Sequence, residues 1–379
     1  MALAVSGGSD SIALMRLAKC WVDRNSTGLT LSVLTVDHRL RPESAEEAMR
    51  AGEWAQAIGL RHHVLAWEGE KPETGIQARA REARYGLMAL WCRNNDAGLL
   101  LTGHTLDDQA ETVLMRLERS LSPGSLAGIA AEGHWNGLRL LRPLLKARRQ
   151  ALRDYLTAIG QDWIEDASNA DLRFERVRAR QALNGLDGHG VTPERLAALA
   201  EASARTGELL DRLTGTWLSR WLKEEDAGIC HAPKEPFLAL PEPLQQHILA
   251  RIVGHYGGGQ AQPEPDELRR LARWVSEGPV RCTLGGALMG RRKNGFWATR
   301  EAGRIPPEPL VIPAGGSAVW DGRFRVTAAP GASVMPAGNL PVPLGADVPA
   351  YVRRAYPRVE LPEGTGQDAK IAFLRIIPI

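Results

Sequence analysis

The sequence predicts an α/β protein: a parallel sheet with helices on both faces, followed by a helical segment and a small, mostly β C-terminal domain. Two observations support this fold class. Up to about residue 145, short apolar runs alternate with helical stretches, and alternating β and α elements imply a parallel sheet. After Gly254, a spacer rich in Gly and Pro at 257–265 precedes short runs that are joined by hairpin turns.

The elements of the first part can be assigned in order. The predicted strands are Leu3–Val5, Leu31–Val36, His63–Ala66, Gly98–Thr102 and Leu138–Leu141. The predicted helices between them are Ser11–Trp21, Glu43–Ile58, Gly75–Asn94 and Asp107–Arg119. Ligands of such a sheet bind at the carboxyl ends of its strands.

Later segments predict further helices at Lys146–Gly160, Leu196–Leu222 and Asp266–Ser276, the second of them a single helix or a helical hairpin. Asn184–Val191 is expected to be a linker. Asn294-Gly295 and Asp321-Gly322 predict two hairpin turns. The predicted domains are therefore 1–183, 184–256 and 266–379.

Composition bounds the class of protein. With 379 residues, 44% hydrophobic and 24% charged, the chain has the profile of a soluble globular protein of two or three domains. Its net charge of +3 is too small to indicate a nucleic-acid binder by itself. The cysteines form no Cys-x-x-Cys pair, which argues against a zinc site, an iron–sulfur cluster or a disulfide scaffold and fits a cytoplasmic location. We expect neither a membrane span nor a signal peptide.

One stretch organises the rest: the turn Ser6-Gly7-Gly8-Ser9-Asp10-Ser11 between the first strand and the first helix. Its glycines permit backbone torsions closed to other residues and let a ligand approach the main chain. The serines and the free N–H groups of the helix start donate toward one point, where the helix dipole favours negative charge. The turn therefore predicts a phosphate cradle, which is not a Walker A loop because no Lys follows the glycines. The alternative is an ordinary Gly-Ser turn.

Two more polar segments follow strand ends. Asp37 comes directly after the second strand, where a nucleotide over the first turn would place its ribose or adenine. The alternative is an acid that only terminates the strand. Gly103-His104 follows the fourth strand, so three motif segments should converge on one crevice.

Three carboxylates lie in the first turn of the helix after His104: Asp107, Asp108 and Glu111. Beside a triphosphate they would suit Mg²⁺ through oxygen ligands. They could equally hold an ammonium group or accept a proton from a nucleophilic amine. The alternative is capping, since acids are favoured at a helix N-terminus and Asp108-x-x-Glu111 resembles a capping pattern. Capping does not need three acids beside a histidine, so we favour a functional cluster.

Basic residues gather after this helix. They are Arg139, Arg142, Lys146, Arg148, Arg149 and Arg153, and later Arg173, Arg176, Arg178 and Arg180. Arginine suits bidentate contacts to phosphate, which favours binding of an RNA backbone over two solvated helix faces. Between the two runs, Trp163–Asp171 is densely polar, and its spacing fits either a functional segment or a turn with a helix cap.

The hexapeptide Ser6–Ser11 resembles the Ser-Gly-Gly-x-Asp-Ser signature of the PP-loop ATP pyrophosphatases, which cleave ATP between its α and β phosphates and transfer AMP to an oxygen of the substrate. Other segments resemble the tRNA(Ile)-lysidine synthase family of that group. They are Val36–Arg41, Gln77–Tyr85, Gly103–Thr112, Arg142–Leu145 and Trp163–Asp171 with the arginines that follow. The resemblance is dense from residue 2 to about 180 and returns weakly at Thr283–Gly286.

The resemblance implies a ligase that uses ATP and Mg²⁺ to join free L-lysine to C2 of the wobble cytidine of a CAU-anticodon tRNA(Ile), through an adenylated cytidine, giving lysidine, AMP and pyrophosphate. It implies that Ser6, Gly7, Gly8, Ser9, Asp10 and Ser11 hold the phosphates and Asp37 the nucleoside, with the metal at Asp10 and Asp108. Asp107, Asp108 and Glu111 would hold Mg²⁺ or lysine, with their roles undivided, and His104 and Arg142 would orient the adenylate. The RNA contacts would be Arg148, Arg149, Arg176, Arg178 and Arg180. Residues 1–183 would be catalytic and the two later domains tRNA-binding, in a monomer or a homodimer.

Three departures from the family pattern stand out. Family members begin further upstream, so we expect Met1 to be a late start. The glycine-rich loop after the acidic helix is altered at Arg119–Ser125, and Val177 replaces an asparagine.

Two rival functions are a PP-loop tRNA thiolase, which usually needs paired cysteines, and a non-catalytic nucleotide- or tRNA-binding protein, which needs no acidic trio. We expect Asp108→Ala to keep the fold and lose turnover.

Overall fold

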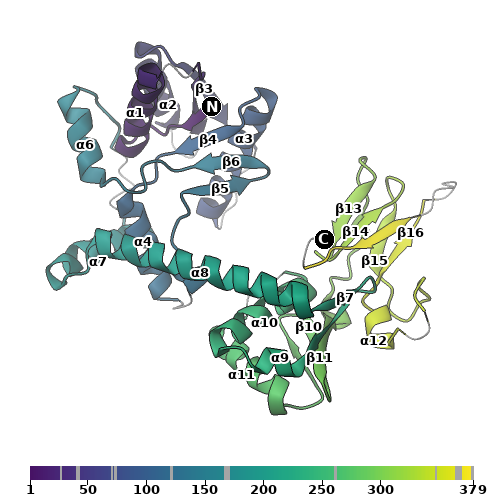
Figure 1. Cartoon of the computed structure of the whole chain (residues 1–379). Helices are drawn as coiled ribbons and strands as arrows, with labels where there is room; N and C mark the ends of the chain where they lie inside the picture. The colour runs from purple at the N-terminus through teal and green to yellow at the C-terminus, as the bar shows by residue number, and fades with distance from the viewer. Residues whose placement is uncertain are drawn as a thin grey trace. The chain divides into compact units, whose positions relative to one another are not determined.

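The computed structural model describes residues 1–25, 28–39, 43–69, 71, 75–119, 123–165, 171–259, 263–345, 348–362 and 369–376. These form two compact units, Met1–Gly207 and Glu208–Ile379, each described by itself. Figure 1 labels most of their helices and strands. Several residues named in the sequence analysis lie outside the described ranges: Leu40 and Arg41, 120–122 of the altered loop, and 166–170 of the polar segment.

The first unit is built on a six-stranded sheet in the order β3-β2-β1-β4-β6-β5. Its strands are β1 (Ala2–Ala4), β2 (Ser32–Asp37), β3 (Arg61–Ala66), β4 (Leu99–Thr102), β5 (Glu132–Trp135) and β6 (Leu138–Leu141). All neighbours pair in parallel except β5, which runs antiparallel to β6 at the edge. β5 was not predicted, although Asn136-Gly137 is a strong hairpin turn and both residues have positive φ, 47° and 82°.

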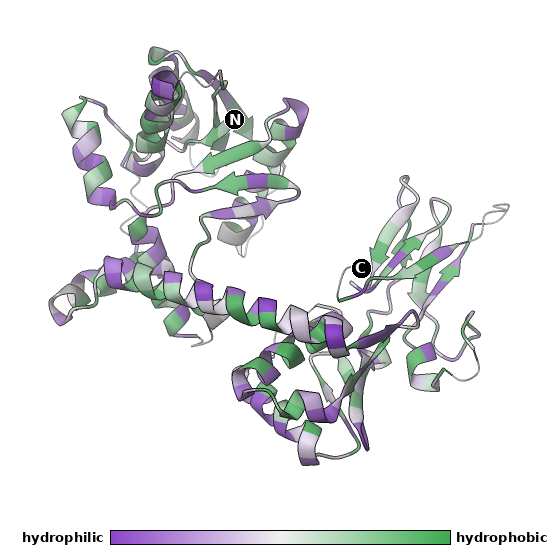
Figure 2. Cartoon of the chain, viewed as in Figure 1, coloured by the Kyte–Doolittle hydropathy of each residue, from purple (hydrophilic) through white to green (hydrophobic). Residues whose placement is uncertain are grey.

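Helices cover both faces of this sheet, as predicted: α1 (Ser9–Asn25), α2 (Ser44–Ala57) and α6 (Arg149–Ala158) lie on one face and α3 (Ile76–Asn94) on the other. The unit also contains α4 (Leu106–Leu117), α5 (Pro123–Leu126) and α7 (Glu175–Leu186), with a 3-10 turn at Asp187–His189. Successive strand residues face opposite sides. Leu3 packs in the cluster that includes α1, α2 and α6, whereas Ala2 packs in the cluster with α3. Strand β4 is accordingly hydrophobic along its length (Figure 2).

The first unit extends beyond the predicted boundary at residue 183. Leu196 and Ala200 of α8 (Pro193–Trp221) pack with Leu183 of α7 and with Ala110 and Val113 of α4. Because these side chains share one core, the start of the predicted linker domain belongs to the first compact unit, and the division between the units falls inside α8. The functional division at 183 and 256 stays a prediction.

The second unit begins with an antiparallel sheet in the order β7-β8-β11-β10-β9. The strands are β7 (Lys223–Glu225), β8 (Ile229–Pro233), β9 (Arg281–Leu284), β10 (Ala287–Arg292) and β11 (Gly295–Arg300). Helices α9 (Lys234–Leu238), α10 (Glu242–Tyr256) and α11 (Pro265–Glu277) share a core with this sheet, in which Phe237 and Phe296 meet edge-on. Residues on both sides of the predicted boundary at 256 therefore pack into one core.

Two three-stranded antiparallel sheets complete this unit, β12-β15-β16 and β13-β14-β17. Their elements are β12 (Leu310–Val311), β13 (Ser317–Trp320), β14 (Phe324–Thr327), β15 (Ser333–Pro336), β16 (Pro357–Glu360) and β17 (Lys370–Phe373), with a 3-10 turn at Ala302–Arg304 and α12 at Ala350–Arg353. The mostly β C-terminal part is thus confirmed. None of the helices within the described ranges is long and apolar enough to cross a membrane.

A buried ion cluster joins the two halves of the second unit. Asp321, at the turn between β13 and β14, accepts from Arg300 of β11 at 3.0 Å and from Arg323 at 2.8 Å. The three side chains are at most 2% exposed. Arg300 also donates to the carbonyl oxygens of Gly257, Gly286 and Arg304. One carboxylate therefore holds two buried guanidinium groups, from segments that belong to different sheets.

The burial of His255 in α10 should make the stability of the folded chain depend on pH. Its ring contacts the rings of Tyr256 and Phe373, and its Nε2 is buried with no hydrogen-bond partner among the described residues. Burial lowers its pKa to about 4, and the nearby charges of Arg323 and Arg251 act in the same direction. Because the unfolded chain binds this proton first, stability should be complete above about pH 6.5 and should be lost as the pH falls toward 4.

The free energy of unfolding should fall between pH 7 and pH 5. We expect this fall to be about 2 kcal/mol smaller in His255→Phe than in the wild type. Denaturant unfolding of both proteins at the two pH values measures the difference. The same loss in the wild type and the variant would contradict this role of His255, since the other titrating groups are common to both chains.

Candidate active site

The predicted phosphate cradle lies between β1 and α1. Gly7 has φ +92°, a conformation that side-chain-bearing residues rarely adopt. The Ser11 hydroxyl donates to the Gly8 carbonyl oxygen at 2.9 Å and accepts from the Ser6 N–H at 3.1 Å, which closes the turn. The N–H groups of Gly7 and Gly8 donate to no acceptor among the described residues. They lie at the N-terminus of α1, so the turn offers free donors to an anion.

A segment distant in sequence lies across this turn. The Ile164 N–H donates to the Gly7 carbonyl oxygen at 2.9 Å, and a Cβ at Gly7 would lie 2.5 Å from Ile164 Cδ1. Glu165 pairs with Arg153 of α6 at 3.0 Å, and Arg153 in turn reaches the Ser9 hydroxyl at 3.5 Å. The start of the polar segment at 163–171 therefore contacts the turn.

Asp37 ends β2 beside this turn but is engaged locally. Its Oδ1 accepts from the Arg39 N–H at 2.9 Å and from the Ser44 hydroxyl at 2.6 Å. Burial would raise the pKa of Asp37, but these hydrogen bonds hold it below its ordinary value. Asp37 thus acts as a turn acid at the start of α2, and its contact with a nucleoside stays a prediction.

The acidic helix α4 is capped by its own first turn. The Asp108 carboxylate accepts from the Thr105 N–H at 2.8 Å and from its hydroxyl at 2.9 Å, while Thr105 accepts from the Asp108 N–H. This is a capping box between Thr105 and Asp108, so the alternative of capping applies to Asp108, although not through the pattern Asp108-x-x-Glu111. It uses only Oδ2 of Asp108, so Oδ1 remains for another partner.

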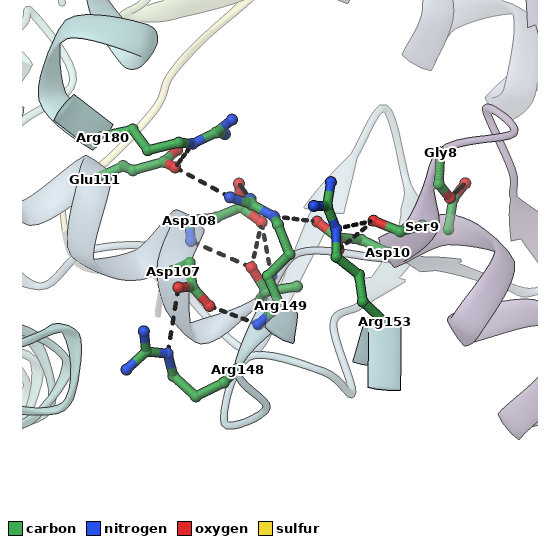
Figure 3. Close-up of polar contacts among 12 residues, drawn as sticks. Gly8, Ser9, Asp10, Asp107, Asp108, Glu111, Arg148, Arg149, Arg153 and Arg180 are labelled. Carbon is green, nitrogen blue, oxygen red and sulfur yellow. Dashed lines mark hydrogen bonds and ion pairs between the residues drawn. The ribbon is translucent and has the colours of Figure 1, made fainter. Parts of the chain in front are cut away.

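That partner is Arg149 at the start of α6 (Figure 3). Its guanidinium donates to Asp10 at 2.9 Å, to Asp108 at 3.0 Å and to Glu111 at 3.4 Å. Burial would lower the pKa of Arg149, but the three carboxylates raise it above its ordinary value. One guanidinium thus joins the phosphate cradle to the acidic helix.

The carboxylates respond unequally to this cation. Burial raises the pKa of Asp10 despite its contact with Arg149. Burial also acts to raise the pKa of Asp108, but Arg149 and the Thr105 N–H lower it overall. Glu111 is 1% exposed; its Oε1 accepts from Arg180 at 2.8 Å, and its Oε2 is buried without a partner among the described residues.

Asp107 points to a different partner. It accepts from the backbone N–H of Arg149 at 2.7 Å and from the Arg148 side chain at 3.3 Å. Since the N-cap residue Arg148 has no side-chain cap of its own, Asp107 caps α6 from α4. The structure therefore brings Asp108 and Glu111 together around Arg149 and sets Asp107 apart from them.

The predicted RNA-binding arginines do not form one open basic face. Arg149 is 17% exposed and surrounded by carboxylates. Arg148 pairs with Glu194 at 2.6 Å as well as with Asp107, and Arg180 is held by Glu111. Arg176 and Arg178 are exposed on α7 and contact only a hydroxyl and backbone carbonyl groups among the described residues. Only these two of the set remain available to a phosphate.

A second group of cations surrounds His104 after β4. Burial lowers the pKa of His104 to about 4, with further lowering from Arg142, Arg176 and Arg84, so the ring is neutral at pH 7. Its Nδ1 bonds the Thr102 hydroxyl at 2.9 Å. Arg142 Nε is buried without a partner among the described residues. Arg84 had no role predicted from the sequence, although it lies in a segment that carries part of the family resemblance. These unneutralised donors fit an anion.

Two of these carboxylates suit Mg²⁺ only together with oxygen atoms of a bound phosphate. No three His, Cys, Asp or Glu side chains within the described ranges are arranged to hold a metal alone. Mg²⁺ is usually bound by one or two carboxylates together with phosphate oxygens of the substrate. Asp10 and Asp108 meet that requirement, because both carboxylates already face one cation beside the phosphate cradle.

Comparisons with known proteins identify the first domain and the family of this chain. The model of the PP-loop domain matches residues 1–186. The tRNA(Ile)-lysidine synthase of Ruegeria pomeroyi is 41% identical over 329 residues, which cover 86% of this chain and 75% of that protein. Those of Mesorhizobium japonicum and Wolbachia pipientis are 37% and 33% identical, over 90% and 86% of this chain and 75% and 76% of their own lengths.

Among solved structures, the U34-tRNA thiolase NcsA of Methanococcus maripaludis is similar with a TM-score of 0.47 at 15% identity, over 55% of this chain and 71% of that one. The identity to the curated relatives and their coverage decide the family. This chain belongs to the tRNA(Ile)-lysidine synthase family.

Proposed function

We propose that this chain is a ligase that uses ATP to join lysine to C2 of the wobble cytidine in a CAU-anticodon tRNA(Ile), giving lysidine, AMP and pyrophosphate. Its relatives carry the name of that activity. The observation that carries the proposal is the juxtaposition of free N–H donors at Gly7 and Gly8 with the carboxylates of Asp10, Asp108 and Glu111. The first group suits a leaving diphosphate, and the second suits an incoming amine.

The first step is adenylation. The β and γ phosphates of ATP bind the N–H groups of the turn at the N-terminus of α1, and Asp37 lies toward the nucleoside. The C2 oxygen of the cytidine attacks the α phosphorus, and pyrophosphate leaves with the electron pair of the broken P–O bond. Fixed N–H donors stabilise the charge that develops there. Mg²⁺ bound by Asp10 and Asp108 would neutralise phosphate charge.

The second step is amination. The side-chain ammonium of lysine gives one proton to a carboxylate, and the resulting amine attacks C2. AMP leaves with the oxygen and the electron pair of the broken C–O bond, and the attached nitrogen gives its second proton to the departing phosphate. Asp108 and Glu111 are the carboxylates we assign to the ammonium, since they face a cation, whereas Asp107 positions α6. Neutral His104 and the free Nε of Arg142 orient the adenylate phosphate.

The remaining assignments follow from this mechanism. Arg176 and Arg178 are the arginines of the predicted set best placed to contact the RNA backbone. The RNA contacts predicted for Arg148, Arg149 and Arg180 are less favoured, because the guanidinium groups of these residues are paired with carboxylates. Residues 1–183 would carry catalysis and 184–256 and 266–379 would bind tRNA, in the cytoplasm, as a monomer or homodimer.

A tRNA thiolase is the less favoured alternative. Burial raises the pKa of Cys92 to about 11 and that of Cys230 to about 12, which disfavours the thiolates that carry sulfur. Burial also raises the pKa of Cys282 to about 11. These thiols are poor nucleophiles at neutral pH.

The deciding assay combines the chain with CAU-anticodon tRNA, ATP and lysine. We expect pyrophosphate release together with a mass gain on that tRNA equal to lysine minus water. Release with a sulfur donor but not with lysine would favour the thiolase, and no release in either reaction would favour a passive binder.

Paired substitutions separate the carboxylates. Asp108→Asn keeps an acceptor for Thr105 but removes the charge that faces Arg149, so we expect lysidine formation to fall roughly 10- to 100-fold with little loss of stability. Asp108→Ala also removes the Asp108 half of the capping box, so it should keep the fold, with a loss of about 1 kcal/mol of stability, and lose turnover. Asp107→Asn keeps an acceptor for the Arg149 N–H and should stay within about tenfold of wild type. Equal losses for the two Asn variants would refute this division.

A further inference from the structure

The position between the cradle and the acidic helix is already filled by a side chain of the protein. Asp10 comes from α1, Asp108 and Glu111 come from α4, and all three carboxylates accept from Arg149. The guanidinium is thus the counter-ion that allows carboxylates from two helices to lie close together.

The cluster retains capacity for another cation. Arg180 pairs with the same Oε1 of Glu111 that faces Arg149, so Oε2 of Glu111 is left buried and unpartnered among the described residues. Asp108 is also under the influence of the charge of Arg176, which lowers its pKa, so the unsatisfied acceptor of the cluster is Oε2 of Glu111. A buried, unpaired carboxylate oxygen is costly unless a ligand satisfies it.

Arg149 can leave this position without disturbing its helix. Its backbone N–H is held by Asp107, independently of the side chain, and α6 packs on α1 through Leu152 and Leu156. The long side chain could therefore rotate away while the start of α6 stays fixed.

We propose that Arg149 is a placeholder cation: its guanidinium occupies the cation position bounded by Asp10, Asp108 and Glu111, and an incoming cation must displace it. The displacing group is either an ammonium or a divalent metal. That the incoming cation is an ammonium rests on the proposed function. That Arg149 occupies the cation position is independent of that function. Arg149 is in this sense a positioning residue that holds the three carboxylates together until a cationic ligand arrives.

The test is cation binding by the full chain without ATP or tRNA. Wild type, Arg149→Met, Arg149→Lys and Arg153→Met are titrated with Mn²⁺ alone, followed by the EPR signal of free Mn²⁺, and separately with L-lysine alone by calorimetry. Loss of a charge-assisted competitor should make Arg149→Met bind at least one of these cations about tenfold tighter than wild type. Arg149→Lys keeps the positive charge but cannot donate to three carboxylates at once. Its affinity for the same cation should rise about threefold.

Arg153→Met is the matched control, because it removes the same charge from the same helix but contacts Ser9 and Glu165 instead. Its affinities should stay within about twofold of wild type. Unchanged affinity of Arg149→Met for both cations, or an equal gain in Arg153→Met, overturns the proposal. If circular dichroism shows that Arg149→Met is unfolded, Arg149→Lys replaces it in the test. Unchanged affinity of Arg149→Lys for both cations then overturns the proposal. The titrations contain no tRNA, so a failure of lysidine formation would not change what they show about the cation position.

Discussion

Gly7→Ala is expected to reduce pyrophosphate release by at least about 100-fold, the scale of losing a fixed donor to developing charge. Two independent effects act at this residue. Its φ of +92° lies outside the range that alanine tolerates, and the new Cβ would lie 2.5 Å from Ile164 Cδ1. Relief of either effect moves the N–H groups of Gly7 and Gly8 away from the phosphate position. The measurement is ATP-dependent pyrophosphate release with tRNA and lysine at saturating concentrations.

Gly59→Ala is the control for Gly7→Ala, because it introduces backbone strain at a position away from the site. Gly59 has φ +74° in the connection between α2 and β3, and a Cβ there meets nothing within 4 Å. It should lose about 1 kcal/mol of stability, as Gly7→Ala also should, but retain activity. Near-normal release by Gly7→Ala would show that the turn does not hold the leaving phosphates.

Asp321→Asn is expected to destabilise the second unit by about 3–5 kcal/mol, because it leaves two buried guanidinium groups without their carboxylate. The backbone should not contribute, since Asp321 has φ 49° and asparagine adopts this region readily. Thermal and denaturant unfolding of the full chain measure the loss.

Asp266→Asn provides the comparison for this variant. Asp266 pairs with Arg269 at 2.7 Å on the exposed surface of α11, where its side chain is 79% exposed. Its loss should cost less than about 1 kcal/mol. Similar stabilities of the two variants would mean that the buried cluster does not hold the two halves of the unit together.

Much of the fold was predictable from local patterns. The apolar runs and the helical stretches between them indicated the order of elements up to β4, and Asp321-Gly322 predicted the turn that the structure contains. Such patterns depend only on residues close together in the sequence, so they can be recognised without the tertiary structure. The same signal is present at Asn136-Gly137, and it would have predicted β5 had it been applied there.

The site was harder to predict because its partners are distant in sequence. A run of arginines indicates an exposed basic face. Arg149 instead meets Asp10, 139 positions away, and Asp108, 41 positions away. No local pattern separates it from its neighbour Arg148, whose side chain takes a different direction.

The contrast between Asp107 and Asp108 has a simpler origin. Successive helical residues point about 100° apart, so adjacent acids reach different neighbours. This geometry could have been applied to the sequence, whereas the identity of the neighbours could not.

The contact between Ile164 and Gly7 also bears on how the protein is made. The turn at Ser6–Ser11 is synthesised long before residue 164, yet the carbonyl oxygen of Gly7 accepts its hydrogen bond from the N–H of Ile164. The nascent chain therefore cannot complete this turn until more than 150 further residues have been synthesised, and nucleotide binding should begin late in translation.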